Sequence, residues 1–176
     1  MVIGVPKEIK TREYRVGLTP ASVRELVRRG HEVVVQSEAG REIGFPDDVY
    51  KASGARLAGT AQAVFEEAKL IVKVKEPQTN EWGMLRQEHI LFTYLHLAPD
   101  MEQIRGLMDS GCTAIAYETV TDQFGGLPLL APMSEVAGPV TATWMATRYS
   151  SMPMARTTIR IHGKTTTTDS RRVRYV

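Results

Sequence analysis

The chain has 176 residues, of which 43% are hydrophobic and 24% charged, a composition typical of a soluble globular protein that buries a core. No apolar run approaches the roughly 20 residues that a membrane helix needs, and the N-terminus lacks the pattern of a signal peptide. We therefore expect a cytoplasmic protein without a membrane partner. Cys112 is the single cysteine, which excludes an internal disulfide and a cysteine-based zinc site. No metal site is predicted.

The net charge of +2 is unevenly distributed along the chain. Residues 139–176 contain seven Lys and Arg residues but one acid, Asp169, so the first 138 residues are mildly acidic. Nine threonines and few Leu, Ile or Val in residues 139–176 indicate an irregular or partner-dependent tail. A nucleic-acid-binding arm is the weaker interpretation, because few aromatic residues separate the basic ones.

Apolar runs and helix signals alternate through residues 1–138. A strand is predicted at 2–5, and a charged loop at 7–18 follows it. Thr19 and Pro20 then begin a helix that continues over 21–29 and ends at Gly30, before a strand at 31–36. This strand-helix-strand unit predicts a parallel sheet with a right-handed crossover.

The alternation continues to the end of this region and predicts a doubly wound, mostly parallel, flavodoxin-like α/β domain over residues 1–138. Residues 139–176 are predicted to form the separate, irregular tail, in which one short strand at 157–162 is conceivable. The further predicted helices are 46–53, 60–69, a short one within 79–85, 99–110 and one beginning within 133–137; the further strands are 55–58, 70–75, 90–95 and 112–117.

Three basic groups lie at the ends of predicted strands: Arg15 in the loop after the strand 2–5, Lys75 at the end of the strand 70–75, and His96 directly after the strand 90–95. Because parallel strands present their carboxyl ends at one edge, these side chains could meet in a single crevice. A guanidinium and an ammonium suit a carboxylate ligand, and an imidazole can exchange a proton with a carbonyl or alcohol oxygen. The pattern favours 2-oxo or 2-amino acid chemistry. The alternative, that His96 is structural and the other two are solvated loop charges, stays open at this point.

Several separate stretches resemble the N-terminal, substrate-binding part of bacterial L-alanine dehydrogenase and, more distantly, the alpha subunit of proton-translocating transhydrogenase. They are Ile3-Gly-Val-Pro-Lys-Glu-Ile-Lys10, Arg15-Val-Gly-Leu-Thr-Pro20, Val72-Lys-Val-Lys-Glu-Pro77, Leu91-Phe-Thr-Tyr-Leu-His-Leu-Ala98 and Leu127-Pro-Leu-Leu-Ala-Pro-Met-Ser-Glu-Val-Ala-Gly138. The last two favour alanine dehydrogenase.

The resemblance implies specific roles. Arg15 and Lys75 would hold the carboxylate of pyruvate or alanine, and His96 would be the acid/base partner, with Lys75 also near the reacting carbonyl. Tyr94 and Glu118 would line the cleft, and Ser134 would lie near the nicotinamide cofactor. The implied reaction is reversible, NAD-dependent oxidative deamination of L-alanine to pyruvate and ammonia by a homo-oligomer.

The chain departs from this family at Pro139. The family's Rossmann domain would begin with a strand, a Gly-x-Gly-x-x-Gly turn and a helix in succession. This pattern does not occur in the 176 residues. We therefore expect a form truncated before that domain, which binds NAD weakly at best and is inactive alone. The alternative is a non-catalytic module that binds small carboxylates, or assists assembly, alongside a separate nucleotide-binding chain.

Overall fold

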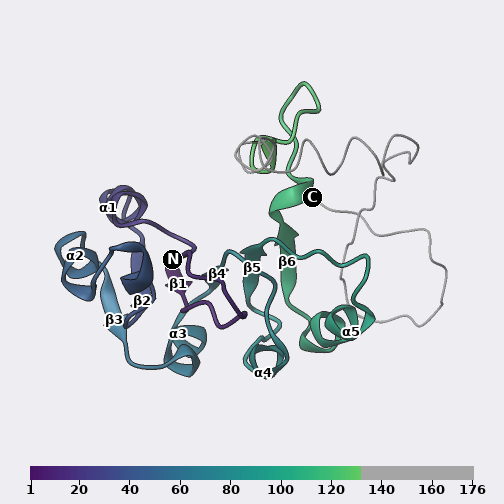
Figure 1. Ribbon diagram of the computed structural model, residues 1–176, viewed down its shortest axis with the longest axis horizontal. Helices are drawn as coiled ribbons and strands as arrows, with labels where there is room; N and C mark the ends of the chain where they lie inside the picture. Colours follow the sequence, from purple (N-terminus) through teal and green to yellow (C-terminus); the bar gives the residue numbers. More distant parts are fainter. Residues whose placement is uncertain (132–176) are drawn as a thin grey trace.

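Six parallel strands form one sheet in the order β3-β2-β1-β4-β5-β6 (Figure 1). The structure is a computed structural model, and it describes residues 1–131. The strands are β1 (Val2–Val5), β2 (Glu32–Gln36), β3 (Arg56–Ala58), β4 (Leu70–Val72), β5 (Ile90–Thr93) and β6 (Thr113–Ala116). The helices are α1 (Pro20–Arg28), α2 (Asp47–Ala52), α3 (Ala61–Glu67), α4 (Thr79–Trp82) and α5 (Met101–Ser110), with short 3-10 helices η1 (Arg41–Ile43) and η2 (Tyr117–Thr119).

Helix α1 begins and ends at the residues that the sequence predicts. The Thr19 side chain accepts a hydrogen bond from the backbone N–H of Ser22 at 3.3 Å, and Pro20 occupies the first helical position. After the helix, Gly30 adopts a left-handed φ of 81°, which lets the chain turn back into β2. The first strand-helix-strand unit is therefore confirmed.

Helices lie on both faces of the sheet, with α1 and α2 on one side and α3, α4 and α5 on the other (Figure 1). Successive side chains of a strand point to opposite faces, so β1 contributes to two cores. Ile3 and Val5 pack in the core that includes Val23 and Tyr50, whereas Val2 packs against the core that includes Phe65, Leu91 and Leu107. The prediction of a doubly wound, parallel α/β fold is confirmed.

Strands β4 and β5 end earlier than their apolar runs predict, and glutamate side chains bind the backbone beyond them. The sequence predicts strands at 70–75 and 90–95. Instead, the N–H of Val74 donates to the Glu8 carboxylate at 2.6 Å, and the N–H of Leu95 donates to Glu118 at 3.1 Å. These carboxylates replace the hydrogen bonds that a longer ladder would provide.

The strand order differs from the flavodoxin order 2-1-3-4-5 and follows the other common doubly wound order, 3-2-1-4-5-6. The order in which strands are added to the sheet therefore reverses between β1 and β4. The crevice at the carboxyl ends of these two strands is the expected ligand position. The helix predicted to begin within 133–137 and the strand at 157–162 lie outside the described residues. None of the helices within residues 1–131 has the length and apolar character needed to cross a membrane.

Candidate functional site

Arg15 and Lys75 lie on the two segments that leave β1 and β4, on either side of the point where the strand order reverses. The segment after β1 runs over residues 6–19 and carries Arg15, and Lys75 follows β4 closely. An ion pair between Lys10 and Glu76 joins the two segments. The two predicted carboxylate-binding residues therefore lie on neighbouring segments at the carboxyl ends of β1 and β4.

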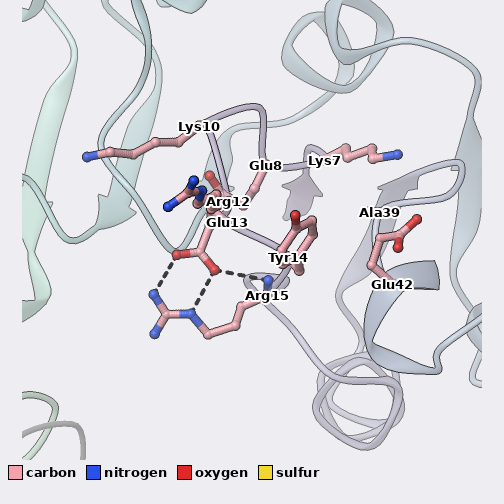
Figure 2. A pocket seen from close by; sticks show the side chains of 9 residues that line it. All are labelled: Lys7, Glu8, Lys10, Arg12, Glu13, Tyr14, Arg15, Ala39 and Glu42. Carbon is pink, nitrogen blue, oxygen red and sulfur yellow. Dashed lines mark hydrogen bonds and ion pairs between the residues drawn. The ribbon is translucent and has the colours of Figure 1, made fainter. Parts of the chain in front are cut away.

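The Arg15 guanidinium already holds a carboxylate, that of Glu13 (Figure 2). Its Nε donates to Oε1 of Glu13 at 2.8 Å and its Nη2 donates to Oε2 at 2.6 Å, the two parallel bonds with which Arg binds carboxylates. The backbone N–H of Arg15 also donates to Oε1, at 3.0 Å. The guanidinium therefore has the orientation needed to bind a carboxylate.

The charges around this pair favour the ionised forms of both Glu13 and Arg15. The hydrogen bonds from Arg15 lower the pKa of Glu13, and the nearby charge of Lys75 contributes in the same direction. The carboxylate of Glu13 in turn raises the pKa of Arg15. The charge of Lys75 thus acts on the same carboxylate that the guanidinium binds.

The backbone of Lys75 is fixed on both sides. Its N–H points to Oε1 of Glu8 at 3.4 Å, the oxygen that also accepts the shorter bond from Val74. Its carbonyl oxygen accepts a hydrogen bond from the Thr93 hydroxyl at 2.8 Å, and the Thr93 side chain is fully buried. The side chain of Lys75, which is half-buried, therefore leaves from a well-defined backbone position.

Lys73, directly after β4, forms a buried ion triad. Its Nζ lies 2.8 Å from Oε1 of Glu81 and 3.2 Å from Oε2 of Glu8, and all three side chains are at least 98% buried. Burial raises the pKa of Glu8, and the positive charge of Lys73 opposes that rise. The second oxygen of Glu81 accepts the backbone N–H of Gln78 at 2.8 Å, in the capping box of α4.

His96 follows β5 in a left-handed conformation with a φ of 47°, which is uncommon for a residue other than glycine. Its backbone N–H donates to Oε1 of Glu118 at 2.8 Å, so that carboxylate supports the turn. The imidazole is exposed, and it stacks on the ring of Tyr94 with centroids 6.0 Å apart. Tyr94 in turn packs edge-on against Tyr117 at 4.9 Å.

Tyr94 connects this aromatic group to Arg15. The hydroxyl of Tyr94 donates to the carbonyl of Leu129 at 2.6 Å, and burial raises its pKa while the charge of Arg15 opposes the rise. Arg15 and Tyr94 both line an open, mainly apolar cavity of about 620 Å³ on the β4–β5 face of the sheet. The other residues lining this cavity include Val16, Leu70, Val72, Phe92, Tyr117 and Leu129.

Arg15 also lines a smaller, charged cavity of about 340 Å³ formed mainly by the segment after β1 (Figure 2). Arg15 is therefore shared by the charged and the apolar cavity, whereas Lys75, His96 and Glu118 line neither of these two. The position predicted for the cofactor, Ser134, lies outside the described residues.

Sequence reasoning missed Glu8, Glu13 and Lys73. The segment 7–18 was interpreted only as a charged loop, and its glutamates carried no spacing signal that separates them from solvated charges. A lysine within the apolar run 70–75 was the one available signal for Lys73, because lysine is almost never fully buried without a partner.

The described residues do not fit a dinucleotide. A pyrophosphate site in this type of sheet needs a short Gly-rich turn between the first strand and its helix. Here residues 6–19 intervene, and their single glycine, Gly17, is packed so closely that an added Cβ would come within 2.5 Å of the carbonyl oxygen of Val72. Within residues 1–131, His, Cys, Asp and Glu side chains form no group of three that could hold a metal ion.

Comparisons with known proteins identify relatives over most of the chain. It is 57% identical over 138 residues to an alanine dehydrogenase of Halomonas elongata, which covers 78% of this chain and 37% of that protein. It is 54% identical over 142 residues to an alanine dehydrogenase of Mycobacterium tuberculosis, covering 81% of this chain and 38% of that one. The chain thus spans less than two fifths of the length of these relatives.

Solved structures agree with the sequence matches. A structure of L-alanine dehydrogenase superposes with a TM-score of 0.77 at 47% identity, over 84% of this chain and 40% of that one. A transhydrogenase from Sinorhizobium meliloti superposes with a TM-score of 0.72 at 27% identity, over 86% and 46%. The protein-family model described as alanine dehydrogenase/PNT, N-terminal domain, matches residues 4–137 of the sequence. The chain belongs to this family.

Proposed function

We propose that the chain carries the carboxylate-binding half of an alanine dehydrogenase active site, with a small 2-oxo or 2-amino acid such as pyruvate or alanine as its ligand. The observation that supports this most directly is the bidentate contact between Arg15 and Glu13, because it places a carboxylate on a guanidinium beside Lys75. A free ligand carboxylate would take the place of the Glu13 carboxylate.

The other residues follow from this placement. Arg15 receives the ligand carboxylate through two parallel hydrogen bonds, and Lys75 adds a positive point charge to the same anion and to the adjacent carbonyl oxygen. His96, held beside Tyr94, exchanges a proton with the oxygen or nitrogen on C2. Glu118 keeps His96 in its left-handed turn.

In the full reaction, NAD would accept hydride from C2 of alanine. The residues described do not fit that cofactor, so we propose that the 176-residue chain binds small carboxylates but does not transfer hydride alone. The boundary we propose runs between residues 138 and 139, with the carboxylate-binding domain before it and the basic tail after it.

Calorimetric titration of the purified chain with pyruvate and with NADH tests this assignment. We expect measurable pyruvate binding that Arg15→Met weakens by at least about tenfold, since a charge-assisted bidentate contact contributes roughly 1.5–3 kcal/mol. The control is Arg29→Met, which removes an exposed arginine that pairs with Glu25 on the helix surface. Equal pyruvate affinity of Arg15→Met and the unmodified chain, or alanine-dependent NADH formation by the chain alone, would contradict the proposal.

The second candidate function is an assembly module, and the apolar cavity over β4 and β5 favours it. Its lining residues, among them Leu70, Val72 and Phe92, are the type that a protein interface covers. Light scattering across a range of protein concentrations tests this second function. A molar mass that stays at that of a single chain argues against assembly, and a molar mass that rises with concentration supports a homo-oligomer.

A further inference from the structure

The buried triad of Glu8, Lys73 and Glu81 is more than a stabilising contact, because one of its members also binds the backbone of a proposed ligand-binding residue. Glu8 uses its two oxygens differently. Oε2 faces the Lys73 ammonium at 3.2 Å, whereas Oε1 accepts the N–H of Val74 at 2.6 Å and points to the N–H of Lys75 at 3.4 Å. A single side chain therefore connects the buried charge to the backbone at Lys75.

Glu8 also lies on the same segment as Arg15, the residues 6–19 that follow β1. Its contact with Val74 crosses from that segment to the one that follows β4, and the ion pair between Lys10 and Glu76 makes a second crossing nearer the surface. Of these two contacts between the segments, the one through Glu8 is buried and ends at the backbone next to Lys75. It thus sets how far Lys75 stands from the segment that carries Arg15.

The third member, Glu81, has no such connection. Its oxygens bind the Lys73 ammonium and the backbone N–H of Gln78 at the start of α4. Glu8 and Glu81 are therefore two buried carboxylates on the same ammonium, of which only Glu8 reaches Lys75.

We propose that Glu8 is a positioning residue of the carboxylate site, which fixes the backbone of Lys75 relative to Arg15 while Lys73 neutralises its buried charge. This inference rests on the proposed function for its effect on ligand binding. A small carboxylate must reach the ammonium of Lys75 and the guanidinium of Arg15 together, so a shift of about 1 Å between the two segments weakens binding sharply.

The charge arithmetic of the triad supplies a matched pair of variants. Two carboxylates and one ammonium carry a net charge of −1, so removal of either carboxylate leaves Lys73 in a neutral pair with the other. Glu8→Ala and Glu81→Ala thus make the same change in buried charge, but only Glu8→Ala removes the acceptor of the Val74 and Lys75 N–H groups. Glu8→Gln keeps an oxygen that can accept those bonds and is the rescue variant.

The experiment measures amide hydrogen exchange at Val74 and Lys75 in the ligand-free chain and the dissociation constant for pyruvate by calorimetry. We expect Glu8→Ala to accelerate exchange at both amides by at least about tenfold and to raise the pyruvate dissociation constant by on the order of tenfold to a hundredfold. Glu81→Ala should change neither by more than about threefold, and Glu8→Gln should recover most of the loss. Should Glu8→Ala fail to fold, Glu8→Asp replaces it, because it keeps the charge but is one methylene shorter.

Two outcomes would overturn the inference: exchange at Lys75 that is unchanged without Glu8, or pyruvate binding that Glu81→Ala weakens as much as Glu8→Ala does. Absence of pyruvate binding by the unmodified chain would instead count against the proposed function. The exchange rates need no ligand, so in that case they still decide whether Glu8 fixes the backbone of Lys75.

Discussion

Replacing Glu13 with Gln should raise the affinity of the Arg15 site for small carboxylates. In the ligand-free chain the Glu13 carboxylate occupies the guanidinium through bonds of 2.8 and 2.6 Å, so a ligand must displace it before it can bind in the same way. An amide at this position competes less well because it carries no charge. The change also removes a negative charge that lies close enough to Lys75 to be influenced by it.

The expected gain is modest because the Arg15 side chain is 41% exposed. Charge-assisted hydrogen bonds contribute about 1.5–3 kcal/mol where water is excluded, but exposed ion pairs contribute about 0–1 kcal/mol. We take about 1 kcal/mol for the competition at this pair, in which only the arginine is partly exposed, and this corresponds to roughly fivefold tighter binding of pyruvate.

Calorimetric titration of the two chains with pyruvate at pH 7 measures the difference. The matched control is Glu42→Gln, which removes the same charge from the same cavity at a residue on η1 rather than beside Arg15. If Glu13→Gln binds pyruvate no more tightly than the unmodified chain, or if Glu42→Gln gives an equal gain, then Glu13 does not compete with the ligand and the reasoning is wrong.

Three further predictions concern stability. Because the pKa of Glu13 is lowered from its usual value of 4.5, its stabilising effect is complete above pH 4.5 and is lost as the pH falls through the folded-state pKa; Glu13→Gln should therefore lose less stability between pH 5 and pH 3 in urea titrations. Lys73→Met leaves two buried carboxylates without their cation and should lower the free energy of unfolding by about 3–5 kcal/mol at pH 7, a loss that is absent if the triad contributes nothing. Gly17→Ala places a Cβ 2.5 Å from the carbonyl oxygen of Val72 and should cost about 1–3 kcal/mol in the same assay, whereas an unchanged midpoint would show that the segment moves freely.

The sequence predicted the sheet well because its strands and helices have local signals. Thr19 and Pro20 mark a helix start without reference to the rest of the chain, and Gly30 marks its end. The parallel sheet followed from the alternation of these elements. The strand order did not, because an apolar run such as 90–95 carries no signal for which strand lies beside it.

The candidate site was predictable only in part, for a similar reason. Arg15, Lys75 and His96 could be placed at one edge because each lies at the end of a predicted strand or in the loop after it. Glu8 acts on Val74 and Lys75 from 66 and 67 positions away in the chain, and no local pattern reports such a contact. Lys73 was likewise interpreted as part of a strand, although its partners Glu8 and Glu81 belong to two other segments.

Three glutamates act at the carboxyl edge of the sheet, and two of them, Glu8 and Glu118, share one physical role. Beyond the strand ends, several N–H donors bond to a carboxylate and not to a neighbouring strand: Glu8 accepts from Val74 and Lys75, and Glu118 accepts from Leu95 and His96.

Glu13 is the third of these carboxylates, and its donor is a different kind of group. It binds the guanidinium of Arg15, whose side chain is 41% exposed, whereas Glu8 faces the ammonium of Lys73, whose side chain is fully buried. A small carboxylate from solvent can therefore compete for Arg15 without disturbing the packed edge. The proposed ligand site rests on this difference in access to the two cations: Glu8 and Glu118 complete the backbone at the sheet edge, and the Glu13 carboxylate is the one that a ligand would displace.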